Sequence, residues 1–94
     1  MPKFFFDYEE GLTTRRSDEP IELAGLAVAS ELALQAAHEA GLDLARRQPS
    51  GEIVVVVSSQ DRLELARAKI SWSVELSSSG QATGVFADDI LQVG

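Results

Sequence analysis

The run Ile53-Val54-Val55-Val56-Val57 decides the fold. β-Branched residues favour extended backbone, so the run predicts a strand over Glu52–Ser58. Side chains alternate between the two faces of a strand, and here both faces are apolar. A strand of this kind is typical of the centre of a sheet that is covered on both sides. We therefore expect a sheet around this strand, with a helix on one face and a further cover on the other.

A long strand is expected after the turn Ser59–Arg62. From Ala66 onward, apolar residues occupy every second position, which is typical of a strand with one buried face. Leu63 and Leu65 are out of phase with this series. A β-bulge at Leu65 and Ala66 would reconcile the two phases, because one extra residue inverts the alternation. We expect this strand to span Leu63–Leu76.

The N-terminal segment predicts a hairpin. Three consecutive Phe residues followed by Asp and Tyr give Lys3–Tyr8 a high strand propensity. Glu9-Glu10-Gly11 is a turn signal, because glycine adopts positive φ at no steric cost. Leu12–Arg16 is then the expected return strand, and Ser17–Pro20 is a polar break.

An amphipathic helix is expected between the two pairs of strands. It begins near Ala24 or Gly25 and continues to about Arg46, with Gly41 inside it. A helical wheel places one set of small and apolar residues together, which predicts a buried face that can lie close to a sheet. This set is Leu26, Ala29, Ala33, Ala36, Ala37, Ala40 and Leu44. Glu31, Gln35 and His38 fall on the opposite, solvent-facing side.

These elements predict one α+β domain over residues 1–76, with the order ββαββ and a mainly antiparallel sheet. We expect residues 77–94 to be a Ser-rich linker and a short tail. The spacing of Phe86, Ile90 and Val93 fits one or two helical turns, and a loosely ordered terminus is the other interpretation. An ordered tail would dock on the open sheet face or on a neighbouring chain.

The start of the chain and the helix entry carry a family resemblance. Met1-Pro2-Lys3-Phe4-Phe5-Phe6 resembles the Met-Pro-Arg-Tyr-Phe-Phe start of a family of small, mostly alphaproteobacterial domains of unknown function. Asp18–Leu23 stands where that family has an Asp-Glu-Gly-X-Glu-Leu segment before an Ala-rich helix, and Ile53–Val57 and Leu63–Val74 match its later strands. The resemblance covers about residues 1–76. It implies a ββαββ fold in a bacterial protein and no particular activity.

The chain departs from the family pattern at several positions. Asp7 stands where the family commonly has His, and Pro20 replaces a Gly. The turn Ser59-Gln60-Asp61-Arg62 lacks the Gly of the family's Asp-X-X-Gly-like turn. The tail after Ser77 is additional. Any role that the family's polar turn positions share is therefore not carried over to this chain.

Composition excludes several classes of function. The chain has 94 residues, no cysteine and a net charge of −7. Disulfides, thiolate metal sites and a Cys nucleophile are excluded. The acidic residues are spread over both halves and leave no basic stripe, so nucleic-acid binding is disfavoured. No apolar run is long enough to span a bilayer or to serve as a signal peptide, so we expect a cytoplasmic protein without a membrane partner.

The ionisable residues do not predict a site. His38, with Glu31 and Gln35 nearby on the helix, falls short of the three protein ligands of a usual catalytic zinc site. Adjacent acids do not fit the spacing of a calcium loop, and we interpret them as solvated turn charges. These pairs are Glu9-Glu10, Asp18-Glu19 and Asp88-Asp89.

Two further patterns have structural interpretations. Ser77–Ser79 has no base placed by a nucleophile motif, and Gly80 and Gly84 are too sparse for a phosphate-binding loop. Phe4–Phe6 with Trp72 would suit a base-stacking platform, but the nearby charges are acidic, which favours core packing or an apolar contact face. We therefore expect no catalytic, cofactor-binding or metal-ligating residue and no small-molecule ligand.

The expected function is that of a non-enzymatic interaction or accessory domain that self-associates, most simply as a homodimer. One helix covers only one face of the predicted sheet, and an exposed apolar face of that size is unusual for a monomer. An antitoxin-like regulator that binds a basic protein partner is one alternative. A small enzyme with an unrecognised site is another.

Overall fold

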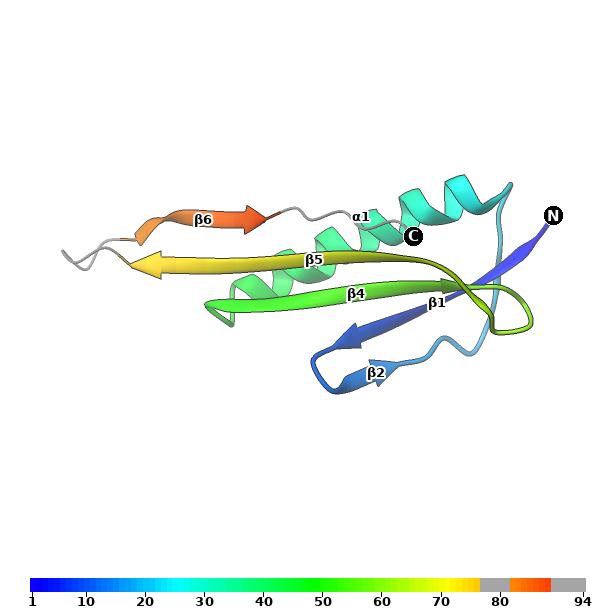
Figure 1. Cartoon of the computed structure of the whole chain (residues 1–94), viewed down its shortest axis with the longest axis horizontal. Helices are drawn as coiled ribbons and strands as arrows, with labels where there is room; N and C mark the ends of the chain where they lie inside the picture. Colours follow the sequence, from blue (N-terminus) through cyan, green and yellow to red (C-terminus); the bar gives the residue numbers. More distant parts are fainter. Residues whose placement is uncertain (77–81, 89–94) are drawn as a thin grey trace.

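In the computed structural model, the described residues form one helix packed on one face of an antiparallel sheet (Figure 1). It describes residues 1–76 and 82–88, with only the backbone for Leu76 and 82–88. The strands are β1 (Lys3–Glu10), β2 (Thr13–Arg15), β3 (Ile21–Glu22), β4 (Ser50–Ser58), β5 (Glu64–Leu76) and β6 (Ala82–Asp88), and the helix is α1 (Leu26–Ala45). Within this part the sheet order is β2-β1-β4-β5-β6, and β3 also pairs with β1. The predicted α+β class and ββαββ order are confirmed, with β3 and β6 as additions.

The helix lies close to β4 and β5 because its buried face carries almost no side-chain bulk. The predicted alanine face is confirmed, since Ala29, Ala33 and Ala37 are at most 1% exposed. Gly41 is buried on the same face, and a β-carbon there would stand 3.3 Å from Cγ2 of Ile70. The helical wheel also placed Leu26 on this face. That prediction is wrong, because Leu26 is the first residue of the helix and is 41% exposed.

The helix-facing side of the sheet provides the rest of the core. Phe4 of β1 is buried there, and Phe6 and Tyr8 pack against the same cluster. From β4 and β5 come Ile53, Val55, Val57, Ala66, Ala68, Ile70 and Trp72. The predicted alternation along β5 is therefore confirmed from Ala66 to Trp72.

The face of the sheet away from α1, called the open face here, differs from the expected bare apolar surface. Val54 and Val56 of β4 point to it, yet each is only 6% exposed. Their cross-strand neighbours are charged: Val54 lies between Glu9 and Lys69, and Val56 lies between Asp7 and Arg67. The aliphatic parts of long charged side chains can cover apolar neighbours while the charge stays in water. This expectation of an exposed apolar face is wrong, because polar residues on β1 and β5 cover it.

The predicted bulge at Leu65 is present. Val57 pairs with Ala66 but Ser58 pairs with Glu64, so Leu65 is the extra residue on β5. Its position brings Glu64 and Arg67, which are three residues apart, into a salt bridge of 2.8 Å. In a regular strand a spacing of three would place the two side chains on opposite faces. The bulge therefore sets which residues of β5 face the open side.

The N-terminal hairpin forms as predicted, with a longer first strand and a short addition. Gly11 has a φ of 58° in the turn between β1 and β2, as the turn signal indicated. After the break at residues 16–20 the chain returns to β1, where β3 pairs Ile21 with Phe4. Sequence patterns did not predict this pairing, because two residues are too few to show an alternation.

The tail is extended over residues 82–88, where helical turns had been one interpretation. Strand β6 pairs antiparallel with the edge of β5, from Leu76 with Ala82 to Ser71 with Asp88 (Figure 1). Through Asp88 it therefore extends the sheet and does not lie on either face. The expected linker at Ser77–Gly80 and the end of the tail after Asp88 lie outside the described residues.

Candidate functional site

An ion pair on the open face joins the β4–β5 loop to the first strand. Nη1 of Arg62 lies 3.1 Å from Oδ2 and 3.3 Å from Oδ1 of Asp7. The guanidinium carbon of Arg62 lies 3.7 Å from the centroid of the Phe5 ring, a cation–π distance. Asp7 is only 8% exposed. The pair is therefore partly shielded from water, where charge–charge attraction is stronger than between fully exposed groups.

Ser17, in the segment between β2 and β3, is held by both members of this pair. Its backbone N–H donates to Oδ1 of Asp7 at 2.8 Å, and its carbonyl accepts from Nη2 of Arg62 at 2.6 Å. We call Asp7, Ser17 and Arg62 the latch. β2 and β3 hold the two ends of residues 16–20 to β1, and between them the latch attaches the segment at Ser17.

The backbone of Arg62 is in the left-handed region, with a φ of 67°. Among the described residues it is the only non-glycine residue with positive φ. That conformation costs a side-chain-bearing residue free energy, and it persists when the surroundings determine it. The structure brings Asp7 together with the turn that ends at Arg62. Their separation of 55 residues hid the contact from sequence reasoning.

A groove runs between α1 and the N-terminal strands on the helix-facing side. Its volume is about 430 Å³. Phe6 and Tyr8 of β1 lie beneath it, and Leu32 and Ala36 of α1 form one wall. The other wall is formed by Arg15, Arg16, Ser17 and Ile21. We call this the α1–β1 groove; it has an apolar base and a basic rim.

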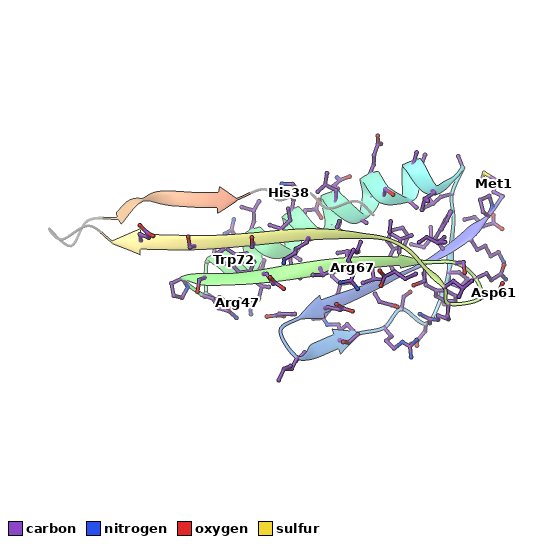
Figure 2. All side chains as sticks on the ribbon, in the orientation of Figure 1. Met1, His38, Arg47, Asp61, Arg67 and Trp72 are labelled. Carbon is purple, nitrogen blue, oxygen red and sulfur yellow. The ribbon has the colours of Figure 1, made fainter. Side chains whose placement is uncertain are left out.

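The groove continues toward the C-terminal end of α1 as a smaller, more polar hollow of about 230 Å³. The two hollows share Tyr8 and Arg15. The remaining lining residues of the second are Glu10, Thr13, Ala40, Asp43, Leu44, Arg47 and Ile53. Arg47 is paired there with Asp43 at 3.1 Å. Figure 2 shows Arg47 and Trp72 toward this end of the molecule, and Met1 and Asp61 at the opposite end.

Two parallel rows of side chains follow the exposed part of α1 beside the groove. Residues four apart on a helix are neighbours on its surface. The row next to the groove is apolar and consists of Val28, Leu32, Ala36 and Ala40. The row outside it is exposed and polar, and consists of Glu31, Gln35 and Glu39. An acidic edge therefore borders the apolar row on the side away from Arg15 and Arg16.

The histidine considered from the sequence is not on a fully solvated surface. His38 is half-buried, and its Nδ1 lies 3.2 Å from the carbonyl oxygen of Leu34 in the preceding turn. Glu31 and Gln35 are exposed. Among the described residues no three His, Asp or Glu side chains gather as metal ligands would.

The acidic pairs are dispersed. Glu9 is half-buried on the open face and Glu10 is exposed beside the second hollow, so the two point to opposite faces. Asp18 and Glu19 are exposed in the segment between β2 and β3. The pair Asp88-Asp89, the serines 77–79 and the glycines 80 and 84 lie outside the residues whose side chains are described.

The aromatic residues do not form a common platform. Phe4 and Phe6 contribute to the core under α1, while Phe5 lies on the open face beneath Arg62. Trp72 is buried, and its Nε1 donates to the carbonyl of Gln48 at 3.2 Å. The aromatic run is therefore divided between the two faces of β1, and the core-packing interpretation applies to its two even-numbered members.

Comparison with known proteins then places the chain in a family. The family model described as "Domain of unknown function (DUF6894)" matches residues 3–71. The chain belongs to this DUF6894 family. The match spans β1 through most of β5 and ends before β6. No curated protein and no solved structure matches the chain.

Membership in the DUF6894 family confirms the expectation of a small domain of unknown function. The latch and the α1–β1 groove both lie inside the matched region. Among the described residues no helix is long and apolar enough to cross a membrane. The family description names no reaction or ligand.

Proposed function

We propose that this DUF6894 domain is a non-enzymatic interaction domain that self-associates, and that two copies meet across the α1–β1 groove. One observation carries the proposal: basic, apolar and acidic strips follow one another across this face. The basic strip is Arg15 and Arg16, and the acidic strip is the helix row that includes Glu31 and Glu39. The apolar strip between them is Ile21, Val28, Leu32 and the base of the groove.

The apolar strip supplies the contact area. Ile21 is 49% exposed, and Val28 and Leu32 are about 40% exposed. Ile21 and Leu32 line the groove together with the partly buried Phe6 and Tyr8, and Val28 lies one turn before Leu32 on α1. Removing apolar surface from water is the main favourable term in association. A second copy laid over this strip would cover the exposed aliphatic side chains of both chains at once.

The order of the charges makes the face self-complementary. In a dimer with a two-fold axis, each residue contacts in the partner the residue that contacts it. If the axis lies in the interface, runs along the apolar strip and passes near Leu32, the basic strip of one copy faces the acidic row of the other, twice per dimer. Arg15 and Arg16 are exposed and form no ion pair among the described residues, so they are available for such contacts. Charge complementarity of this kind selects the partner and speeds association.

Size and composition also favour this assignment. A domain of 94 residues buries a smaller fraction of its chain surface than a larger one, so an interface adds appreciably to its stability. The absence of cysteine agrees with a cytoplasmic location, which we include in the proposal. The net charge of −7 makes a basic partner protein the principal competing occupant of the same surface.

A charge-swap experiment tests the proposal. Sedimentation equilibrium of the full chain across a wide range of concentrations should show a dimer. The variants R15E/R16E and E31R/E39R should each dissociate at least about tenfold more readily, because like charges then face each other. Mixed together, the two variants should form a heterodimer, because both charged contacts are again between opposite signs.

Two outcomes would overturn the proposal. A control variant shows whether any charge reversal on the domain weakens association. K69E alters a charge on the open face and should leave the association of the full chain unchanged. A native chain that stays monomeric at the highest concentrations would exclude self-association. A dimer that both charge-swap variants retain would place the interface elsewhere on the domain.

A further inference from the structure

We infer that Asp7 and Arg62 are positioning residues for the α1–β1 groove, although both act from the opposite face of the sheet. The functional part of this inference rests on the self-association proposed above. Its structural part, that the latch holds one wall of the groove, stands on the contacts of Ser17.

Ser17 is part of the latch and also lines the α1–β1 groove. It lines the groove beside Arg16, and both of its backbone polar groups bond to latch side chains. These bonds measure 2.8 Å to Asp7 and 2.6 Å to Arg62. Arg15 and Ile21 of this wall are held by strand pairing with β1, but residues 16–20 have no strand partner, so the positions of Arg16 and Ser17 depend on the latch. The latch thereby also sets the place of Arg16 in the basic strip.

The loop that carries Arg62 is arranged for this contact. A turn that only had to reverse the chain would be easier with glycine at a φ of 67°. The arginine is retained there with three partners: the Asp7 carboxylate, the Phe5 ring and the Ser17 carbonyl. A strained residue held by several specific contacts is an indication of function. Here the contacts tie the β4–β5 loop to the wall of the groove.

The variant R62G tests the role of the Arg62 side chain independently of its backbone conformation. Glycine adopts positive φ without strain, so the loop keeps its shape while the latch loses its cation. D7N provides a second test from the other side of the ion pair. R67A is the matched control, because Arg67 also forms a two-bonded ion pair on the open face, with Glu64, but does not contact the segment between β2 and β3.

Two measurements are needed. The first is amide hydrogen exchange at Ser17, made in the L32E background so that association does not interfere. Exchange should become about tenfold faster with R62G or D7N and stay unchanged with R67A, because the segment then opens locally. The second is the dimer dissociation constant of the full chain, which should rise about tenfold with R62G and D7N and not with R67A. Denaturation curves of the same proteins show whether global stability is equal.

The outcomes distinguish the two proposals. Unchanged exchange at Ser17 in R62G and D7N would overturn the latch itself. Faster exchange with an unchanged dissociation constant would overturn the positioning role and leave self-association standing. A native chain that does not dimerise would overturn the proposed function and the positioning role with it, while the exchange data would still report on the latch.

Discussion

Trp72 lies directly against the backbone of Gly51, its cross-strand partner. A β-carbon on Gly51 would stand 2.7 Å from Cζ2 and 3.0 Å from Cη2 of the indole. The ring is 6% exposed and is tied by its Nε1 to the carbonyl of Gln48. A glycine at the start of β4 therefore provides the space in which the only tryptophan of the chain is buried.

Gly51→Ala should destabilise the domain by about 1–3 kcal/mol, because the new methyl group overpacks a rigid ring that has no free space. Urea denaturation followed by circular dichroism measures the loss. Tryptophan fluorescence should change in the native state, since the indole has to move. Ser73→Ala, an exposed position on β5, is the control and should stay within about 0.5 kcal/mol of the native chain. Equal stability of Gly51→Ala and the native chain would contradict the packing described here.

Gly41 is a second glycine at which an added β-carbon would crowd a neighbouring side chain. Alanine at this position gains about 1 kcal/mol of helix propensity. However, its β-carbon would lie 3.3 Å from Cγ2 of Ile70, a tight contact with a side chain that is 4% exposed and packed in the core. We expect Gly41→Ala to lower the free energy of unfolding by about 1 kcal/mol, because overpacking outweighs propensity.

A double-mutant cycle checks this assignment. Ile70→Leu moves the branch of the side chain away from Cβ and so removes the methyl group that a β-carbon at position 41 would meet. The variant G41A/I70L should therefore be more stable than the sum of the single effects predicts, by about 0.5–1 kcal/mol. Strict additivity would show that the helix and β5 are not in close contact at this point.

The parts of the fold that sequence patterns predicted are those governed by local periodicity. The alanines of α1 recur every four residues on its buried face, and the valine run of β4 is continuous in the sequence. Both patterns can be recognised within a short stretch of sequence. Even the bulge at Leu65 could be located, because it leaves a change of phase in the alternation. The helix was also correctly predicted to continue through Gly41, because the helical period continues beyond it. The glycine packs closely against Ile70.

The parts that were not predicted depend on contacts between distant residues. Val54 and Val56 are covered by charged side chains on the neighbouring strands. A hydrophobicity pattern assigns charged side chains to solvent and does not show that they cover apolar neighbours. The latch joins residues 55 apart, and no local pattern reports such a pair. The α1–β1 groove requires the path of residues 16–20, which have no periodicity. Sequence patterns therefore missed both the latch and the groove.

The bulge at Leu65 has an electrostatic consequence. Arg67 donates to both carboxylate oxygens of Glu64, at 2.8 and 3.1 Å. These hydrogen bonds lower the pKa of Glu64 below its ordinary value of 4.5 and raise the pKa of Arg67. Because the folded-state pKa of the acid is depressed, the stabilisation is present above the unfolded value and is lost as the pH falls through the folded value. Both side chains are more than 40% exposed, so solvent and salt screen the interaction.

Glu64→Gln should therefore cost only about 0.5 kcal/mol or less at pH 7 and low salt, which is typical of exposed ion pairs. The difference from the native chain should fall as the pH drops through the depressed folded-state pKa of Glu64, because protonation removes the charge, and it should shrink at pH 7 in high salt. Denaturation curves over a series of pH values measure it. Glu19→Gln is the control, since that exposed side chain forms no ion pair within the described residues. A Glu64→Gln difference that persisted at low pH would mean that the carboxylate stabilises β5 by some means other than its charge.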